Sequence, residues 1–308
     1  MIITITMNPA VDKTITLDQL ELGGLSRVKS IKQDAGGKGI NVSKTIKALH
    51  GESLALGFVG GESGTFIVKA LNELDIRHDF VYLDQNTRVN TKVVENSGRV
   101  SEINEPGPII NREMVDLLLE KVRKYAAEDV VFVLAGSIPL GVDKGIYGKI
   151  VDIAHLNGAK VILDADGDLF RESLPSNPDY IKPNREELEK YAGLDHEASK
   201  EELIAIGQGL KDKGIDNVLI SLGKEGALFL MERNAFVPGL KVVAQSTVGA
   251  GDALVGALAY SVEHKLELED LIELAIATSA GAVTTHGTQP PTNELVNELK
   301  KQVKIEML

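Results

Sequence analysis

A turn near the C-terminus, from Thr247 to Asp252, carries the residues best suited to chemistry. Its glycines, Gly249 and Gly251, let the backbone bend tightly, and the small, apolar stretch that follows predicts a helix whose first N–H groups point back at the turn. Such a helix start attracts anions, and the Asp252 carboxylate beside it is placed to accept a proton from an alcohol. The turn therefore indicates phosphoryl transfer to a hydroxyl. From these residues alone, simple capping of the helix by Asp252 is an equal interpretation.

A second glycine-rich run, residues 35–42, places three glycines around Lys38 at the start of a predicted helix. Backbone can approach a ligand closely there, while Lys38 and Asn41 point at it. The run is not a Walker A motif, because Gly39 rather than Ser or Thr follows the lysine, and no G-x-G-x-x-G follows a strand elsewhere. A plain glycine-rich turn is the alternative interpretation.

Two further segments carry weaker signals. Asp12 follows the first predicted strand, where an α/β fold opens its ligand crevice, and its carboxylate can accept hydrogen bonds from sugar hydroxyls. Asn184 and Glu187 follow the short predicted strand 180–181 and can hold the water shell of a magnesium ion. The same pair also fits an ordinary capping box at a helix start.

The elements that must position these residues alternate between short apolar strands and amphipathic helices, which predicts an α/β fold around a mostly parallel sheet covered on both faces. The predicted strands are 2–6, 54–59, 80–83, 130–134, 160–163, 180–181 and 218–222. The predicted helices are 39–49, 65–74, 111–126, 144–156, 186–191 and 200–213.

Residues 11–30 and 87–104 interrupt this rhythm with alternating patterns and no helix, and a turn signal lies at 96–99. We interpret them as a separate small sheet, with edge strands of the main sheet as the alternative. The large domain then comprises 1–10, 31–86 and 105–308.

Composition excludes several classes of protein. The 308 residues include 33 Lys and Arg against 45 Asp and Glu, a net charge of −12, which argues against nucleic acid and anionic membranes as partners. A phosphorylated substrate must therefore meet a local basic cluster. There is no cysteine, so disulfides, thiolate nucleophiles and Cys-ligated zinc are excluded. The N-terminal strand lacks the features of a signal peptide, and we expect a soluble cytoplasmic protein.

Taken together, the glycine-rich run around Lys38, the Asn184–Glu187 segment and the Gly-Ala-Gly-Asp turn make the chain resemble the PfkB branch of the ribokinase superfamily of sugar kinases. The resemblance covers essentially the whole chain. It implies a ribokinase-like three-layer fold, with a mostly parallel central sheet covered by helices on both faces, plus a small β-sheet lid at 11–30 and 87–104. In this family the lid covers the sugar and often forms a homodimer interface. Four further motifs resemble those of bacterial members that act on fructose 1-phosphate, and kinases of tagatose 6-phosphate are close relatives of these members. The motifs lie at residues 6–12, 23–27, 57–61 and 135–139.

The resemblance assigns roles residue by residue. Asp252 is implied as the general base, and the N–H groups of Gly249, Ala250 and Gly251 as the anion hole for the transferred phosphoryl group. The implied ligands of the sugar hydroxyls are Asp12, Gly37 and Asn41. The implied ligands of the phosphate already on the sugar are Arg27, Lys38, Arg88 and Ser137.

On the nucleotide side, the resemblance implies ATP and Mg²⁺ as cofactors, with the metal held by Asn184 and Glu187 through water. The residues implied in nucleotide binding are Lys182, Asn184, Ser221, Gly223 and Gly226. One position departs from the family pattern, since Ala253 stands where relatives commonly have Ser after the Gly-Asp pair, which puts one detail of phosphate binding in doubt.

The activity implied by the resemblance is ATP-dependent phosphorylation of a sugar phosphate, fructose 1-phosphate to fructose 1,6-bisphosphate in first place. Tagatose 6-phosphate or fructose 6-phosphate are alternative substrates, because Arg27, Lys38 and Arg88 favour a phosphorylated sugar without showing which carbon bears the phosphate. A remote alternative is a sugar-phosphate sensor that kept the fold and lost catalysis. The intact Asp252 and its glycine turn argue against that alternative.

Overall fold

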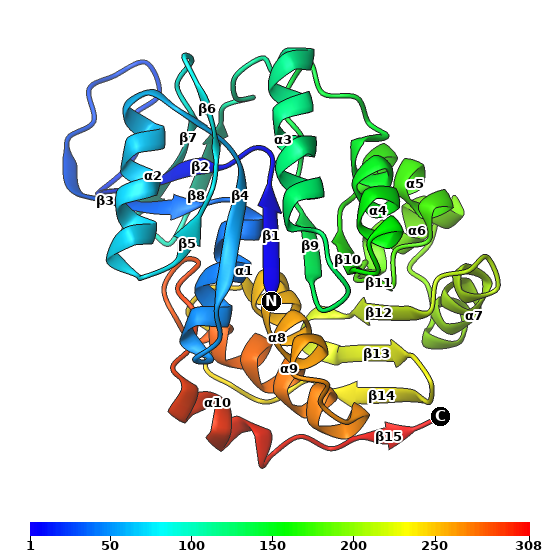
Figure 1. The fold of residues 1–308 in the computed structure, drawn as a ribbon. Coiled ribbons are helices and arrows are strands. Elements are labelled where there is room, and N and C mark those ends of the chain that lie inside the picture. The colour runs from blue at the N-terminus through cyan, green and yellow to red at the C-terminus, as the bar shows by residue number, and fades with distance from the viewer.

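A computed structural model describes residues 1–308, and its centre is an eleven-stranded sheet (Figure 1). The strand order is β15-β14-β13-β12-β11-β10-β9-β1-β4-β5, with β6 pairing on β4. Their bounds are β1 Ile2–Thr6, β4 Ser53–Gly60, β5 Arg77–His78, β6 Val81–Leu83, β9 Val131–Ala135, β10 Lys160–Asp164, β11 Tyr180–Ile181, β12 Asn217–Ser221, β13 Gly226–Leu230, β14 Asn234–Pro238 and β15 Glu306–Met307.

All strand pairs from β12 to β5 in this order are parallel, as is the pair of β6 with β4. Only β13, β14 and β15 join antiparallel, at one edge of the sheet. Both β1 and β9 are fully buried because helices cover both of their faces, and β9 is a continuous apolar run. The carboxyl ends of the parallel strands therefore meet along one edge of the sheet.

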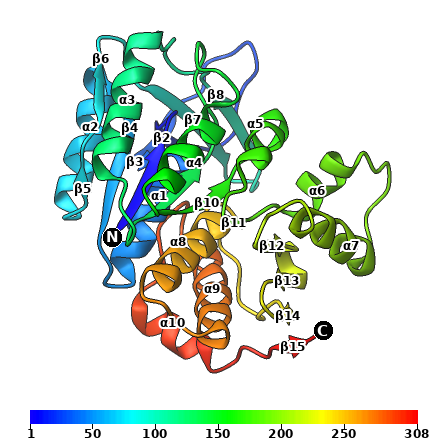
Figure 2. The same cartoon turned by 45° about the vertical axis from the view of Figure 1, so that its right-hand side comes forward.

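One face of the sheet is covered by α1, α8 and α9, with α10 outside them, as Figure 2 shows. Their bounds are α1 Lys38–Ala48, α8 Ala250–Glu263, α9 Leu268–Val283 and α10 Asn293–Lys300. The other face carries five helices, α3 Arg112–Tyr125, α4 Ile146–Leu156, α5 Gly167–Ser173, α6 Arg185–Ala192 and α7 Lys200–Lys211, while α2 Gly61–Glu73 packs beside β4. The predicted three-layer α/β fold is confirmed.

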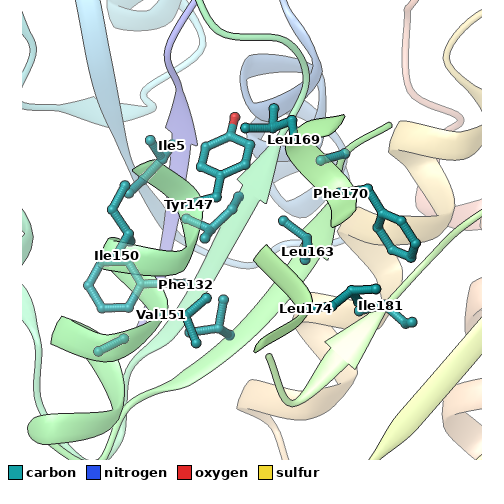
Figure 3. Packing of buried hydrophobic residues seen from close by; sticks show 14 of the residues in the cluster. Ile5, Phe132, Tyr147, Ile150, Val151, Leu163, Leu169, Phe170, Leu174 and Ile181 are labelled. Carbon is teal, nitrogen blue, oxygen red and sulfur yellow. The ribbon is translucent and has the colours of Figure 1, made fainter. Parts of the chain in front are cut away.

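The core under α4 shows how a helix is fixed on the sheet (Figure 3). Tyr147, Ile150 and Val151 of α4 are fully buried and belong to the same apolar cluster as Phe132 of β9 and Leu163 of β10. Burying a side chain of this size stabilises the fold by roughly 1.5–3 kcal/mol. The cluster thus holds the ends of β9 and β10, which carry site residues, in fixed positions.

A second, four-stranded sheet lies at one end of the molecule, with the order β3-β2-β7-β8 (Figure 1). Its bounds are β2 Ala10–Leu17, β3 Val28–Gly36, β7 Arg88–Glu95 and β8 Val100–Asn104. The predicted small separate sheet is confirmed, although β3 continues to Gly36, six residues past the predicted end at 30. We call these four strands the lid sheet.

Several short elements escaped prediction: β5, α5 and the antiparallel edge strands. Two-residue strands such as β5 have no periodicity to detect, and α5 is a seven-residue helix. No helix of the structure is both long enough and apolar enough to cross a membrane.

Candidate active site

A cavity of about 350 Å³ lies between the carboxyl edge of the main sheet and the lid sheet. Thr6 ends β1, Ala135 ends β9, and the lid contributes residues of β2, β7 and β8 to the wall. Only two of its 23 lining residues are hydrophobic, which suits a polar ligand such as a sugar better than a lipid or an aromatic compound. This is the place where open α/β sheets bind their ligands.

Asp252 reaches this cavity from the first turn of α8. The helix begins at Ala250, and Gly249 before it has φ +85°, a left-handed conformation that favours glycine. No side chain caps the helix, so the capping interpretation of Asp252 is not realised. The N–H groups of the first turn have no partner within the helix, and such a helix start is a common place for an anion to bind.

Asp252 as a whole residue is 8% exposed, and one of its carboxylate oxygens accepts a hydrogen bond. Asn41 Nδ2 on α1 donates a hydrogen bond of 2.8 Å to Asp252 Oδ2. Burial and, after it, the nearby Asp164 charge raise the pKa of Asp252, Asn41, Lys38 and Lys182 oppose them, and the net result is a pKa of about 6. The group is therefore ionised at neutral pH and is much more basic than an ordinary aspartate.

Asp164, which the sequence analysis did not single out, forms the centre of the site. It is the last residue of β10, only 1% exposed, and its Oδ1 lies 3.3 Å from Lys38 Nζ and 3.2 Å from Lys182 Nζ. Burial raises the pKa of Asp164, but the two ammonium groups outweigh it and hold the pKa below its ordinary value. A carboxylate ending an apolar parallel strand was the signal that would have identified it.

The two lysines bring positive charge beside the start of α8. Burial alone lowers the pKa of Lys38, but Asp164 and Asp252 raise it above its ordinary value, so Lys38 stays protonated. A Cβ built on Gly251 would lie 3.8 Å from Lys182 Nζ, which places this ammonium group next to the backbone of the predicted anion hole. The predicted anion hole thus has a buried cation beside its helix N–H groups.

The lid wall of the cavity is built around Asp12 on β2. Asn90 Nδ2, on the neighbouring β7, donates to Asp12 Oδ1 at 3.3 Å, and a Cβ on Gly36 would come within 2.0 Å of Asp12 Oδ2, so only glycine leaves room for the carboxylate. Burial raises the pKa of Asp12, and this effect exceeds the opposing effects of Asn90, Lys44 and Arg88.

Arg88 on β7 is held in place by backbone carbonyls. Its Nε and one terminal nitrogen donate to the Asn8 carbonyl at 3.2 and 2.9 Å, and the other terminal nitrogen donates to the Glu105 carbonyl at 3.2 Å. The guanidinium group is therefore oriented before any ligand arrives, with further N–H groups left to bind an anion.

Four buried polar side-chain atoms in the cavity wall have no hydrogen-bond partner: Thr6 Oγ1, Asn8 Oδ1, Asn41 Oδ1 and Asn90 Oδ1. An unpaired buried polar atom costs roughly 1–3 kcal/mol, so such atoms are rare outside binding sites. All four can accept a hydrogen bond. The cavity therefore offers acceptors that match a ligand rich in hydroxyl groups.

The predicted ligands of the substrate phosphate do not all come together. Lys38, Arg88 and Ser137 line the cavity, as do Asp12, Gly37 and Asn41. Arg27 is exposed in the connection between β2 and β3 and does not line the cavity. The wall also carries carboxylates among its cations, so the predicted local basic cluster is a mixed one.

The predicted nucleotide segment lies at the carboxyl ends of β11 and β12. Asn184 and Glu187 form the capping box at the start of α6, with the Asn184 side chain accepting from Glu187 N at 2.8 Å and Glu187 Oε2 accepting from Asn184 N at 2.9 Å. Asn184 also pairs with Ser221 in an isolated parallel bridge. Gly223 and Gly226 follow in the turn between β12 and β13, and none of these residues lines the cavity.

Comparisons with known proteins find relatives that match nearly the whole chain. The model of the pfkB family of carbohydrate kinases matches residues 5–295. A 1-phosphofructokinase of Borreliella burgdorferi is 38% identical over 288 residues, covering 92% of this chain and 91% of the relative. The structure of phosphofructokinase-2 from Escherichia coli in complex with substrates and products superposes with a TM-score of 0.92 at 27% identity, covering 98% of each chain. Arabidopsis thaliana ribokinase, complexed with ribose and ATP, has a TM-score of 0.82 at 21% identity over 97% of this chain and 98% of its own, a likeness of fold alone.

Proposed function

The chain belongs to the pfkB family of carbohydrate kinases, and from this we propose that it transfers the γ-phosphoryl group of ATP to fructose 1-phosphate, giving fructose 1,6-bisphosphate. The observation that carries the proposal is a buried carboxylate, Asp252, at the start of a helix and at the wall of a polar cavity that also holds Arg88 and Lys38. The full-length similarity to proteins named 1-phosphofructokinase supports this choice of sugar.

In the proposed reaction, Asp252 accepts the proton of the C6 hydroxyl as that oxygen bonds to the γ-phosphorus and the bond to the bridging oxygen of ADP breaks. A pKa of about 6 suits this role, because the group is ionised at neutral pH yet basic enough to take the proton. The N–H groups of Gly249, Ala250 and Gly251 stabilise the charge on the transferred phosphoryl oxygens.

The half-buried Lys38 and the buried Lys182 complete the electrostatics. Lys182, beside Gly251, neutralises phosphoryl charge on the nucleotide side, and Lys38 does so on the sugar side, because Asp164 lies between them and holds both ammonium groups. In a buried site such fixed charges act more strongly than in water. Arg88 and Ser137 bind the phosphate already on C1, while Asp12, Gly37 and Asn41 hold the sugar hydroxyls.

In this proposal, Glu187 supplies a carboxylate for the magnesium ion that accompanies ATP in such reactions. Glu187 uses only Oε2 in the capping box, which leaves its second oxygen free, and its charge acts on Lys38. Magnesium commonly keeps several waters and takes one or two carboxylates together with substrate phosphates, which fits Asn184 and Glu187 acting through water. When bound, the metal screens the phosphate charge of ATP. Ser221, Gly223 and Gly226 are assigned to the nucleotide beside it.

The lid sheet also supports a proposed homodimer. Register places Asp12, Asn90 and Asn104 on the face toward the cavity, whereas Ile31 and Ile103 lie on the opposite face and are 56% and 62% exposed. Two large aliphatic side chains exposed on one face of a sheet are suited to contact with a second copy.

The test is a coupled assay of ADP release with Mg-ATP and five acceptors: fructose 1-phosphate, fructose 6-phosphate, tagatose 6-phosphate, fructose and ribose. We expect kcat/KM for fructose 1-phosphate to exceed every other value by about a hundredfold, because one phosphate site holds the C1 phosphate while C6 faces Asp252. A higher kcat/KM for fructose 6-phosphate or tagatose 6-phosphate would refute fructose 1-phosphate as the substrate, while the protein would still be a sugar-phosphate kinase.

A further inference from the structure

Asn41 links two parts of the site that come from opposite ends of the chain. It lies on α1, is 6% exposed, and donates from Nδ2 to Asp252 Oδ2 on α8 over a separation of 211 residues. Its own Oδ1 is buried without a partner, and both residues line the cavity. A single amide group therefore contacts the carboxylate with one end and leaves the other end available to a ligand.

The two oxygens of Asp252 are not equivalent. Oδ2 is occupied by Asn41, whereas no hydrogen bond engages Oδ1. A carboxylate at the end of a short side chain can rotate about its terminal bond, and that torsion has a broad minimum. A hydrogen bond on one oxygen removes this freedom and fixes where the other oxygen points.

We propose that Asn41 is a positioning residue for Asp252, holding Oδ2 so that Oδ1 is aimed at the acceptor hydroxyl. The inference rests on the proposed function for its catalytic meaning, and it goes beyond a role for Asn41 as a ligand of the sugar. The free Asn41 Oδ1 accepts a hydrogen bond from a hydroxyl of the same substrate. Base and acceptor are thereby held against one rigid side chain, which favours a reactive geometry.

Other charged groups around Asp252 also act on its pKa, and a test must leave them unchanged. Asp164 on β10 is the like charge, and Lys38 on α1, Lys182 after β11 and Lys44 on α1 are the cations around it. Asn41 is the one hydrogen-bond donor to the carboxylate. Removing the amide of Asn41 leaves those charges in place, so the change in the pKa of Asp252 reports the loss of the hydrogen bond.

The decisive variant is Asn41→Ala, with Asn41→Leu as a version that preserves side-chain volume. A lost hydrogen bond to the ionised form raises the pKa of Asp252 from about 6, so the acid limb of kcat/KM should move up by roughly one pH unit. We also expect kcat to fall by about tenfold to a hundredfold at pH 8, where the base is ionised in both proteins, because its aim is lost. In a protein that already carries Asp252→Asn, the added Asn41→Ala change should not lower kcat any further.

Asn90→Ala is the matched control, since Asn90 is also a cavity asparagine that donates to a carboxylate, that of Asp12. It should raise KM for the sugar phosphate without moving the acid limb. If Asn41→Ala behaves in the same way, with kcat and the acid limb unchanged, Asn41 is a sugar ligand only and the proposal is wrong.

A spectroscopic titration separates this inference from the proposed function. Carboxyl ¹³C signals of labelled aspartates, with Asp252 assigned by its loss in Asp252→Asn, report the ionisation of Asp252 in the absence of any sugar. A raised titration midpoint in Asn41→Ala supports the positioning contact even if the protein phosphorylates none of the five acceptors. An unchanged midpoint overturns the contact even if fructose 1-phosphate is the substrate.

Discussion

The carboxylate of Asp252 sits where its own charge is disfavoured. It is buried next to a second carboxylate, Asp164, and only partly compensated by Asn41 and two lysines. Its folded pKa of about 6 exceeds the ordinary value of 3.8, so the folded state binds a proton more tightly than the unfolded chain. Such a group lowers stability at neutral pH while supplying a stronger base, a cost that is typical of active sites.

The consequences of that shift can be measured by comparing the wild type with one variant, Asp252→Asn. Wild-type kcat/KM should fall about tenfold per pH unit below pH 6, because the base must be ionised, and Asp252→Asn should lose kcat by about 10²-fold to 10⁴-fold at pH 8. The same variant should raise the free energy of unfolding by about 2–3 kcal/mol at pH 8, since the buried charge is gone.

The size of the stability effect depends on pH in a defined window, between the unfolded and folded pKa values of Asp252. Wild type loses the penalty as pH falls from 6 toward 3.8, so the advantage of Asp252→Asn should vanish below about pH 4, as urea unfolding at several pH values would show. The activity of the same variant tests the catalytic role. If Asp252→Asn kept an activity within about tenfold of wild type, Asp252 could not be the base.

The pairing of Asp164 with two lysines leads to a second prediction at the residue scale. Asp164→Asn leaves the buried Lys182 ammonium without its carboxylate, and breaking a buried pair in this way costs roughly 3–5 kcal/mol. Chemical denaturation measures the loss. Asp168→Asn, which breaks an exposed ion pair with Lys144, is the matched control and should leave the unfolding midpoint unchanged. Equal effects of the two variants would contradict a buried charge network.

At the scale of elements, the junction between Gly249 and α8 is the critical piece. The left-handed φ of +85° at Gly249 turns the chain into the helix, and a Cβ there would approach Thr288 Cα to 3.2 Å. The first N–H groups of α8 are aimed by this turn. We therefore expect strain at this turn to displace the N–H groups of the proposed anion hole.

Gly249→Ala should lower the free energy of unfolding by about 1–2 kcal/mol, because a side chain disfavours the left-handed region, and should lower kcat through displacement of the N–H groups. Gly209→Ala in α7, where a Cβ meets nothing within 4 Å, is the control and should be neutral or stabilising by about 0.5–1 kcal/mol. Thermal unfolding and steady-state kinetics of both variants test this. Wild-type kcat in Gly249→Ala would show that the N–H groups are not displaced.

On the scale of the whole molecule, the lid sheet has two faces with different tasks. One face closes over the cavity with polar side chains, and the other exposes Ile31 and Ile103. The lid is anchored at its base, where Val11, Ala35 and Val89 pack with α2, so its outer part projects from the main domain. The proposed dimer would cover that outer part.

The double variant Ile31→Glu with Ile103→Glu should convert a dimer into a monomer, because two buried charges in each copy would oppose association. Light scattering after size exclusion measures the mass. Ile109→Glu, a change at an equally exposed isoleucine outside the lid sheet, is the control and should leave the mass unchanged. A wild-type mass of one chain, or a dimer that survives the double substitution, would contradict the proposal.

Much of this organisation was predictable from the sequence, because its causes are local. Hydrophobic periodicity indicated the α/β fold and the separate small sheet, and both are confirmed by the structure. The glycine turn before Asp252 predicted a helix start at the right place, since a turn and the helix after it depend on neighbouring residues. The family resemblance then indicated a carbohydrate kinase, which the comparisons confirm.

The electrostatics of the site was decided only by the tertiary structure. Lys38 and Asp164 are 126 residues apart in the chain, and Asn41 and Asp252 are 211 apart, so no local pattern links them. The register of β9, β10 and β1 and the packing of α1 against α8 bring these groups together and bury them. Burial and the distance between charges set the ionisation of Asp252, and both quantities exist only once the chain has folded.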